Sequence, residues 1–454
     1  MRRPRALLAA PFSTSRKLPP PMVFLMAGEP SSDAIGARLM AALRREYRAP
    51  LHFAGVGGAR MAAAGLKPLF PMDDLSVMGF SELVPALPRL VLRFRQTLAA
   101  ARAAAPDLVV GIDSKAFCLR VLGALAADRK QLSDGNAARP ATPALVQYVA
   151  PSAWAFADAP RRAGRLSGVV DELLVLLPFE PALFEAAGTR CTFVGHPALE
   201  EDADDTTTSA CAEVESGGTR DALCLLPGSR RHEVDSNLPI MLDAAERIAH
   251  ALAQRDRHDG RSQLPAHSID RLLLPAPPSV RALVEAHVRS RPPGSLRAVV
   301  TSEVSRHAAY RASSLALACC GTVNTELARA GTPQVAMYRS NALTSLIVRR
   351  LLRPAIRHAA LPNIMNVRRS EAVAEDAATC SDVLIPEVLF EECTAEAVAH
   401  AGIELLTDPD RAERQLATAA RSLESLAVRD AHGAAVPSST IAARALLQHL
   451  PRPS

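Results

Sequence analysis

The chain has 454 residues, of which 48% are hydrophobic, so it can bury two sizeable cores and two domains are expected. It carries 52 basic and 47 acidic residues, but five of the basic residues precede the first acidic one, and the remainder holds 47 of each. This balance excludes the global basic footprint of a nucleic-acid-binding protein, and no apolar run is long enough for a membrane-spanning helix.

Residues 1–20 form a basic leader, MRRPRALLAAPFSTSRKLPP, that lacks acidic residues. Arginine-rich segments with serine and threonine but no acidic residue are typical of organellar transit peptides. The apolar run is too short and too interrupted for a secretory signal. We therefore expect import into a mitochondrion, with a plastid as the alternative; an ordinary disordered tail is the competing interpretation.

Short apolar strands then alternate with Ala- and Leu-rich helical segments, a pattern that predicts parallel, doubly wound α/β sheets. The strands expected in the first half are 22–29, 51–58, 107–113, 144–150, 172–178 and 191–197. Those expected in the second half are 221–229, 271–277, 296–302, 315–321 and 333–338. The polar stretches expected to be surface insertions are 128–143, 255–268 and 367–382.

The domain organisation follows from these elements. Residues 21–199 are expected to form one Rossmann-like domain and residues 221–400 a second. Between them, residues 200–220 are acidic, rich in Thr and Ser, and without apolar periodicity, which is typical of a solvated linker. Residues 401–454 have a helical pattern and are expected to form C-terminal helices.

Two polar groups follow strands of the first half. The segment MAGEPSSDAIG places Glu29, Ser32 and Asp33 directly after the first strand. These residues either cap the next helix or face the carboxyl edge of the sheet, where open α/β sheets bind ligands. Asp113 ends the strand DLVVGID, so it is expected at the same edge. It is either a satisfied loop residue or a general base.

Two further features of the first half are ambiguous. The glycines of 55–58 lack the third glycine and the downstream acidic residue of a dinucleotide turn, so close backbone approach is the favoured interpretation. His196, in the sequence FVGHP, is either a structural residue or a polar group facing a ligand.

The second half contains a turn suited to phosphate. Residues 223–234, LCLLPGSRRHEV, place Gly228, Ser229 and Arg230 between an apolar strand and a helix. Free backbone N–H groups, the positive end of the helix and a bidentate guanidinium together make an anion clamp. The sequence therefore predicts phosphate binding at this turn.

A second turn repeats the pattern. Residues 315–326, LALACCGTVNTE, place Gly321 and Thr322 after an apolar strand, and Glu326 in the first turn of the following helix. The Glu326 carboxylate can accept hydrogen bonds from ribose hydroxyls. Two such turns in one half favour a nucleoside-diphosphate site.

Two segments combine apolar residues with arginine. Residues 74–102 carry Arg89, Arg93, Arg95 and Arg102 at roughly helical spacing, and residues 345–358 repeat the pattern. Such segments either pack on their own domain or contact an anionic bilayer surface or acyl chains. The eight cysteines show no paired C-x-x-C spacing, and no metal site is expected.

Taken together, the segments resemble the lipid-A-disaccharide synthase family. The resemblance extends over nearly the whole chain after the leader, with the family's motifs in their order. The motifs are AGEPSSDAIGA, GVGGARMAAAG, DDLSVMGFSELV, PDLVVGIDSKAF, YVAPSAWAF, LPFEPALFEAAG, FVGHP, LPGSRRHEV, CGTVNTELARAGTPQV, LPNIMN and IPEVLFEECTAE. The resemblance implies a GT-B fold, with two Rossmann-like domains facing each other across a cleft.

It also implies an activity. The family joins UDP-2,3-diacylglucosamine to 2,3-diacylglucosamine 1-phosphate, with inversion, to give a β-1,6-linked disaccharide and UDP, without a metal or another cofactor. By the resemblance, Asp113 is the catalytic candidate, and Glu29, which falls in a cleft motif of the family, is the second. Ser229 and Arg230 belong to the UDP-phosphate site, Glu326 to the ribose, and Asn363 to a cleft motif. Peripheral membrane association follows from the lipid substrates, and the family analogy allows a homodimer.

The chain departs from the family pattern at several positions. Ser32 replaces the usual glycine of the GExSGD turn, where a side chain is expected to crowd the backbone. The sequence DSKAFC at 113–118 differs from the bacterial DxPxFN form and is closer to the plant type. Two alternatives remain: a UDP-sugar transferase or epimerase acting on a soluble sugar, and an inactive lipid- or nucleotide-binding paralogue.

The leader generates a direct prediction. Removing residues 1–20 should leave folding and activity in vitro intact, because this segment has no apolar periodicity to bury. Fused to a fluorescent reporter, the same residues should direct import into mitochondria, as scored by microscopy and protease protection. A reporter that stays in the cytosol would contradict the targeting interpretation.

Overall fold

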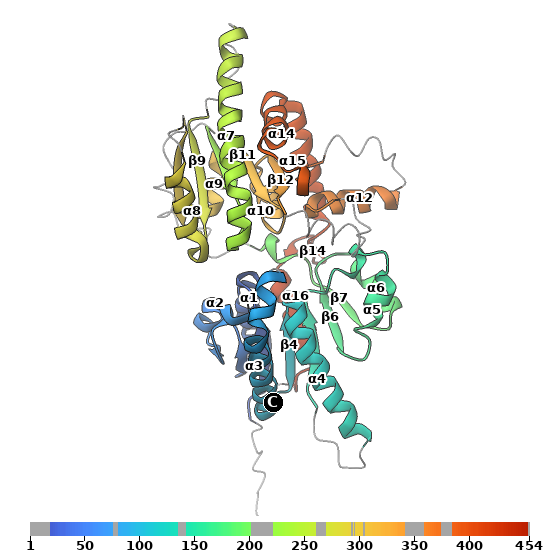
Figure 1. Cartoon of the computed structure of the whole chain (residues 1–454). Helices are drawn as coiled ribbons and strands as arrows, with labels where there is room; N and C mark the ends of the chain where they lie inside the picture. Colours follow the sequence, from blue (N-terminus) through green and yellow to red (C-terminus); the bar gives the residue numbers. More distant parts are fainter. Residues whose placement is uncertain are drawn as a thin grey trace, which may run out of the picture. The chain divides into compact units, whose positions relative to one another are not determined.

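The computed structural model describes residues 19–75, 80–134, 142–200, 221–259, 269–291, 294, 296–302, 305–340, 358–373 and 384–452. By its internal contacts the chain divides into two units (Figure 1). The first comprises residues 1–151, 166–174 and 439–454, and the second comprises residues 152–165 and 175–438.

The first sheet has seven strands in the order β3-β2-β1-β4-β5-β6-β7. Its pairings from β3 through β6 are parallel. The strands are β1 (Met22–Ala27), β2 (His52–Val56), β3 (Lys67–Pro68), β4 (Leu108–Ile112), β5 (Ala144–Tyr148), β6 (Glu172–Val175) and β7 (Cys191–Phe193). Central β4 is buried at every residue, which explains its uninterrupted apolar sequence.

Helices connect these parallel strands, as a parallel sheet requires. In the first unit they are α1 (Pro30–Tyr47), α2 (Ala59–Ala63), η1 (Met72–Leu75), α3 (Phe80–Ala104), α4 (Lys115–Asp134) and the C-terminal α16 (Ser438–Leu447). In the second unit, η2 (Ala153–Ala155), α5 (Ala159–Gly164), α6 (Glu180–Ala186) and η3 (Pro197–Leu199) precede its own sheet.

The second sheet has six parallel strands in the order β10-β9-β8-β11-β12-β13. They are β8 (Ala222–Leu226), β9 (Arg271–Ala276), β10 (Arg297–Ser302), β11 (Ser313–Cys319), β12 (Gln334–Tyr338) and β13 (Glu387–Leu389). A reversal of order at β8 and β11 gives the doubly wound topology, whose ligand edge lies at the carboxyl ends of the strands.

Helices cover both faces of this sheet. One core joins α7 (Arg231–Asp259), α8 (Pro278–Ser290) and α14 (Ala395–Thr407) to the strands. Another joins α9 (Arg306–Ala312) and α10 (Val323–Ala330) to the opposite face. The remaining elements are α12 (Leu361–Val373), η8 (Phe390–Glu392), α15 (Pro409–Glu424) and a short hairpin of β14 (Val428–Arg429) with β15 (Ala435–Val436).

The two units divide differently from the predicted boundaries at 199 and 401. Leu177 and Phe179, just beyond β6, pack with Leu423 and Leu426 of the second unit. Conversely, the end of the chain belongs to the first unit. Tyr47 of α1 donates a 2.8 Å hydrogen bond to the carbonyl of Pro451.

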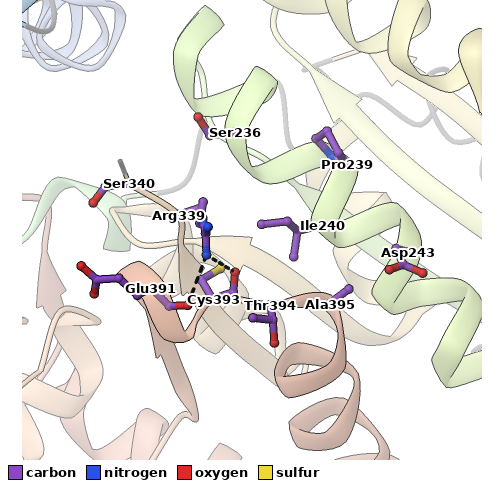
Figure 2. A pocket seen from close by; sticks show the side chains of 10 residues that line it. All are labelled: Ser236, Pro239, Ile240, Asp243, Arg339, Ser340, Glu391, Cys393, Thr394 and Ala395. Atoms are coloured by element: carbon purple, nitrogen blue, oxygen red, sulfur yellow. Dashed lines mark hydrogen bonds between the residues drawn. The ribbon is translucent and has the colours of Figure 1, made fainter. Parts of the chain in front are cut away.

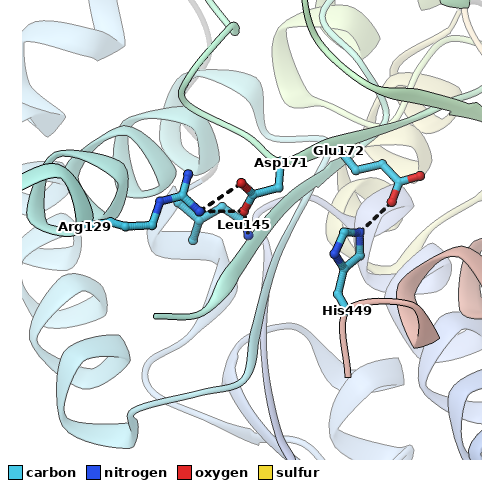
Figure 3. A network of polar contacts seen from close by, with 5 residues as sticks. All are labelled: Arg129, Leu145, Asp171, Glu172 and His449. Atoms are coloured by element: carbon cyan, nitrogen blue, oxygen red, sulfur yellow. Dashed lines mark hydrogen bonds and ion pairs between the residues drawn. The ribbon is translucent and has the colours of Figure 1, made fainter. Parts of the chain in front are cut away.

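A pair of adjacent acidic residues anchors β6 in the first unit (Figure 3). Asp171 accepts hydrogen bonds from Arg129, at 2.7 and 2.9 Å, and from the backbone N–H of Leu145. Glu172, fully buried, lies 2.6 Å from His449 Nε2 beyond α16. The C-terminal segment is therefore fixed to the sheet by polar contacts.

All eleven predicted strands are confirmed, whereas β3, β13 and the β14–β15 hairpin were not predicted. Two or three residues per strand are too few for a periodic signal. The stretches expected to be insertions begin inside helices: α4 extends to 134, α7 to 259 and α12 to 373. Among the described residues, no helix combines the length and apolar character needed to cross a membrane.

Candidate functional site

Asp113 lies at the carboxyl end of β4, where the sequence places it. Its backbone has a positive φ of 48°, and Ser114 follows with a φ of 30°. The Asp113 side chain is 29% exposed, and its Oδ1 lies 3.9 Å from the ammonium nitrogen of Lys115. Within the described part of the chain no hydrogen bond engages its carboxylate. The group is thus held on a rigid sheet edge with its acceptor oxygens available.

The turn after β1 is stabilised by Ser32. The Ser32 hydroxyl accepts hydrogen bonds from the N–H groups of Gly28, at 3.2 Å, and Glu29, at 3.0 Å, and donates to the Glu29 carbonyl. Ser32 is fully buried in α1 without distortion of the helix. The expectation that Ser32 would crowd the backbone was therefore wrong, because its side chain fills space beneath the turn and caps it.

Asp33 has a structural role at the neighbouring turn. Its carboxylate accepts hydrogen bonds of 2.8 to 3.0 Å from the N–H groups of Gly58, Arg60 and Met61. Gly55 supports the expected close approach of backbones, because a Cβ there would lie 1.9 Å from the carbonyl oxygen of Leu25. The GVGG segment therefore allows close packing of two backbones, and Asp33 of α1 fixes the turn that follows it.

The turn of the predicted phosphate clamp is present, but the protein's own Glu233 carboxylate fills it, and phosphate binding there stays a prediction. Gly228 has a φ of 117°, which favours glycine. The Glu233 carboxylate accepts hydrogen bonds from the N–H groups of Ser229, at 3.1 Å, and Arg230, at 3.3 Å. The Arg230 guanidinium donates to the same carboxylate at 2.9 Å. The expectation that these N–H groups would be free was wrong.

Glu233 is therefore the residue that sequence reasoning missed at the clamp. It is the third residue of α7, three positions after Arg230, which is the spacing of the acidic member of a capping box. That signal was present in the sequence. A carboxylate and a phosphate have similar acceptor oxygens, and the Glu233 carboxylate occupies the turn where the sequence predicts a phosphate.

Asn237 connects the clamp to the next turn of the sheet. It is fully buried, donates to the carbonyl of Pro227 at 3.3 Å and accepts from the N–H of Arg339 at 2.8 Å. Pro227 follows β8 and Arg339 follows β12. This one amide therefore fixes two turns of the carboxyl edge relative to each other.

Glu326, the predicted ribose ligand, is oriented by two residues that the sequence did not indicate. Arg306 Nε and the Tyr310 hydroxyl each lie 3.2 Å from Glu326 Oε2. Burial and the negative charge of Glu326 raise the pKa of Tyr310 well above its usual value, so its hydroxyl stays protonated and donates. Glu326 Oε1 has no hydrogen bond within the described residues and can accept from a ligand.

The Gly321–Thr322 turn precedes α10 and is exposed. Asn324 accepts a 2.9 Å hydrogen bond from the N–H of Gly321. A Cβ at Gly321 would meet nothing within 4 Å, so packing inside the protein does not require glycine there. Space above this turn is compatible with the predicted ligand contact.

Asn363 and His196 are buried structural residues. The Asn363 amide donates to the carbonyl of Ile385 and to Glu387, and accepts from the N–H of Ile385, so its contact with a ligand stays a prediction without support from this geometry. His196 Nδ1 accepts from the N–H of Ala198, and burial lowers the pKa of His196 to about 4. His196 is therefore neutral and structural.

A pocket of about 700 Å³ lies along α7 in the second unit. Figure 2 shows Arg339 at its centre, donating to the carbonyls of Glu391, at 3.2 Å, and Cys393, at 3.3 Å. None of the predicted site residues lines it. Its lining consists of Ser236, Pro239, Ile240, Asp243, Arg339, Ser340, Glu391, Cys393, Thr394 and Ala395.

No group of three or more His, Cys, Asp or Glu side chains in the described ranges is arranged to hold a metal ion. The groups at the clamp that can meet an anion are the N–H groups of the turn and the guanidinium of Arg230.

A family model and individual relatives of this chain point to the same family. A family model described as lipid-A-disaccharide synthetase matches residues 23–436. The lipid-A-disaccharide synthase of Rhodospirillum centenum is 39% identical over 399 residues, covering 87% of this chain and 88% of the relative. That of Ruegeria pomeroyi is 36% identical over 395 residues, covering 85% and 87%.

Solved structures share the fold at low identity. The glycotransferase of kitacinnamycin aligns with a TM-score of 0.54 at 15% identity, covering 95% of this chain and 100% of that one. The UDP-GlcNAc 2-epimerase from Neisseria meningitidis aligns with a TM-score of 0.50 at 12% identity, covering 94% and 99%. These likenesses support the GT-B fold class alone.

The contacts of Arg230 at the clamp predict a loss of UDP affinity when this residue is replaced. Arg230→Ala should weaken UDP binding about 10- to 150-fold, because a hydrogen bond to a charged group contributes about 1.5–3 kcal/mol. Isothermal titration of the full chain with UDP measures this. Arg231→Ala is the matched control, since Arg231 is exposed and adjacent. Equal losses in both variants would show that only net charge matters and would remove Arg230 from the site.

Proposed function

We propose that this chain, which belongs to the lipid-A-disaccharide synthase family, joins UDP-2,3-diacylglucosamine to 2,3-diacylglucosamine 1-phosphate. Family membership makes it a lipid-A-disaccharide-forming glycosyltransferase. The proposal adds the two acylated glucosamine substrates, the release of UDP and the β-1,6 linkage. These details come from the family resemblance.

One observation carries the catalytic part of the proposal: the Asp113 carboxylate accepts no hydrogen bond from the described residues and lies 3.9 Å from the Lys115 ammonium. A sugar hydroxyl is a weak nucleophile at neutral pH, so a base within hydrogen-bond reach has to take its proton as it attacks. The carboxylates of Asp33 and Glu233 are occupied by backbone N–H groups of their own unit. Asp113 has no such partner among the described residues, which supports its role as the general base. Glu29 is the alternative.

The clamp supplies the other half of the reaction. As the donor's bond to UDP breaks, negative charge develops on the β-phosphate and needs preorganised donors. The N–H groups of Ser229 and Arg230 and the Arg230 guanidinium are these donors once phosphate replaces the Glu233 carboxylate. Glu326 accepts from the ribose. Direct attack by the acceptor hydroxyl inverts the anomeric carbon.

The two alternative functions are compatible with the same fold, but the exposed side chains favour them less. A transferase or epimerase for a soluble sugar needs no exposed apolar face. Helix α3 nevertheless exposes Leu87 (45%), Val91 (47%) and Leu92 (51%) at helical spacing. A catalytically inactive paralogue would have no need for the Asp113 carboxylate at the sheet edge, which accepts no hydrogen bond from the described residues and lies 3.9 Å from Lys115.

Helix α3 also supports peripheral membrane contact. Arg89 and Arg95 are exposed on the same helix, whereas Arg93 and Arg102 form ion pairs with Asp74 and Asp128 inside the first unit. An apolar strip with exposed arginines suits an anionic bilayer surface. The second predicted segment, 345–358, lies almost entirely outside the described residues.

Import into an organelle and assembly into a homodimer are further parts of the proposal. Residues 1–20 precede the family match, which begins at residue 23, and their composition supports mitochondrial or plastid import. The relatives compared above are bacterial and give this targeting no support. A homodimer stays a proposal that rests on family analogy.

The catalytic proposal is tested with Asp113→Asn, which keeps size and removes basicity. Acceptor-dependent UDP release, assayed in detergent with both acylated substrates, should fall at least about 10²-fold, while the melting temperature and UDP affinity stay unchanged. Glu29→Gln is the comparison. If Asp113→Asn turns over normally and Glu29→Gln does not, the base is Glu29; if the wild type releases UDP without acceptor, the transferase proposal fails.

The membrane proposal is tested on the exposed face of α3. The double variant Val91→Ser, Leu92→Ser should weaken binding to phosphatidylcholine vesicles that contain phosphatidylglycerol by about 10-fold or more, because each buried leucine-sized side chain contributes about 1.5–3 kcal/mol. Vesicle co-sedimentation measures this. Both side chains are about half exposed, so the melting temperature should not change. Unchanged sedimentation would exclude this face.

A further inference from the structure

Three non-glycine residues with positive φ meet where β4 and β5 end. Asp113 and Ser114 have φ values of 48° and 30°, and Val149, the residue after β5, has a φ of 71°. Aspartate tolerates this region, but a β-branched valine there is a genuine outlier. Such a turn persists only when its surroundings hold it.

The group that holds it is the side-chain amide of Gln147, in the buried strand β5. Gln147 is fully buried. Its Nε2 lies 3.0 Å from the carbonyl oxygen of Asp113 and 3.3 Å from those of Tyr148 and Val149. The N–H of Asp113 also donates to the Tyr148 carbonyl at 2.9 Å. One amide therefore ties together the ends of both strands.

The packing around Gln147 is arranged for this contact. Gly111 is its partner across the β4–β5 ladder, and a Cβ at Gly111 would lie 2.5 Å from Gln147 Oε1. Gln147 Oε1 is itself buried without a hydrogen-bond partner in the described part of the chain. The Gln147 side chain therefore leaves its oxygen without a partner while its Nε2 donates to the turn. Ordinary core packing would not require a buried oxygen without a hydrogen bond.

We propose that Gln147 is a positioning residue, whose buried amide holds the strained main chain at Asp113 and so aims the Asp113 carboxylate. The inference rests on the proposed function, because it assigns Gln147 a role in catalysis through Asp113. Gln147 itself touches no substrate in this account. The signal in the sequence is a single amide inside an otherwise apolar strand, ALVQYV.

Gln147→Met is the first test, since methionine has a similar size and no donors. The kcat for disaccharide formation should fall about 10- to 100-fold, because misplacing a reacting group by about 1 Å can cost about 10²-fold. The KM for the donor and the affinity for UDP should stay near wild type. A variant with a lowered melting temperature but a normal kcat would overturn the proposal.

A double-mutant cycle separates this inference from the proposed function. If Gln147 acts through the Asp113 carboxylate, adding Gln147→Met to Asp113→Asn should cost no further activity. Independent, multiplicative losses would contradict the positioning role. Full activity of Asp113→Asn alone would instead refute the assignment of the base, whatever Gln147→Met does.

Gln147→Glu tests the same contact if the methionine variant does not fold. When protonated, the introduced carboxyl group has one O–H donor for the turn, and when ionised it has none. Relative to wild type, its activity should therefore decline as pH rises. Cys118 packs against the same Gly111, but burial raises the pKa of its thiol to about 12, so it stays neutral in the assay. A wild-type pH profile in this variant would overturn the proposal.

Discussion

Turns at the carboxyl edge of a parallel sheet leave backbone N–H and C=O groups that need partners, and at several described turns of this chain buried side chains supply them. Asp33 satisfies the turn after β2, and Gln147 the ends of β4 and β5. In the second unit Glu233 and Asn237 do the same for the turn after β8. A buried backbone group without a partner costs about 1–3 kcal/mol, so these side chains determine which turn conformations exist at the ligand edge.

This requirement also sorts the acidic residues by role. The carboxylates of Asp33, Glu180 and Glu233 each accept two or more backbone N–H groups, and Glu326 is held by Arg306 and Tyr310. Asp113 stands apart, because its carboxylate has no hydrogen bond among the described residues. Carboxylates that accept backbone N–H groups stabilise the fold, whereas a carboxylate without such bonds is available for the role proposed for Asp113. Glu233 differs from these, since its carboxylate occupies the turn where the substrate's phosphate is proposed to bind.

Much of the fold could be predicted from the sequence, because buried parallel strands have continuous apolar sequences, and all eleven of those predicted are present. The short strands β3 and β13 carry no comparable signal. The positions of Asp113, Arg230 and Glu326 at strand or helix ends were also predictable. Their partners were less so: Glu233 had the spacing of a capping box, but Tyr310 and Gln147 act through contacts distant in sequence. Ser32 was misjudged because a residue inside the helix had been assigned to the turn itself.

The proposed function is a single inverting transfer between two acylated sugars, with Asp113 proposed as the base and with Ser229 and Arg230 proposed as the phosphate donors. The most direct measurement is the structure of the product that the purified full chain makes from UDP-2,3-diacylglucosamine and 2,3-diacylglucosamine 1-phosphate, by mass spectrometry and by NMR of the new anomeric proton. The account predicts a tetra-acylated disaccharide 1-phosphate with a β-1,6 linkage, formed in equal amount to UDP. An α linkage, a free diacylglucosamine released by hydrolysis, or a donor recovered unchanged would contradict it.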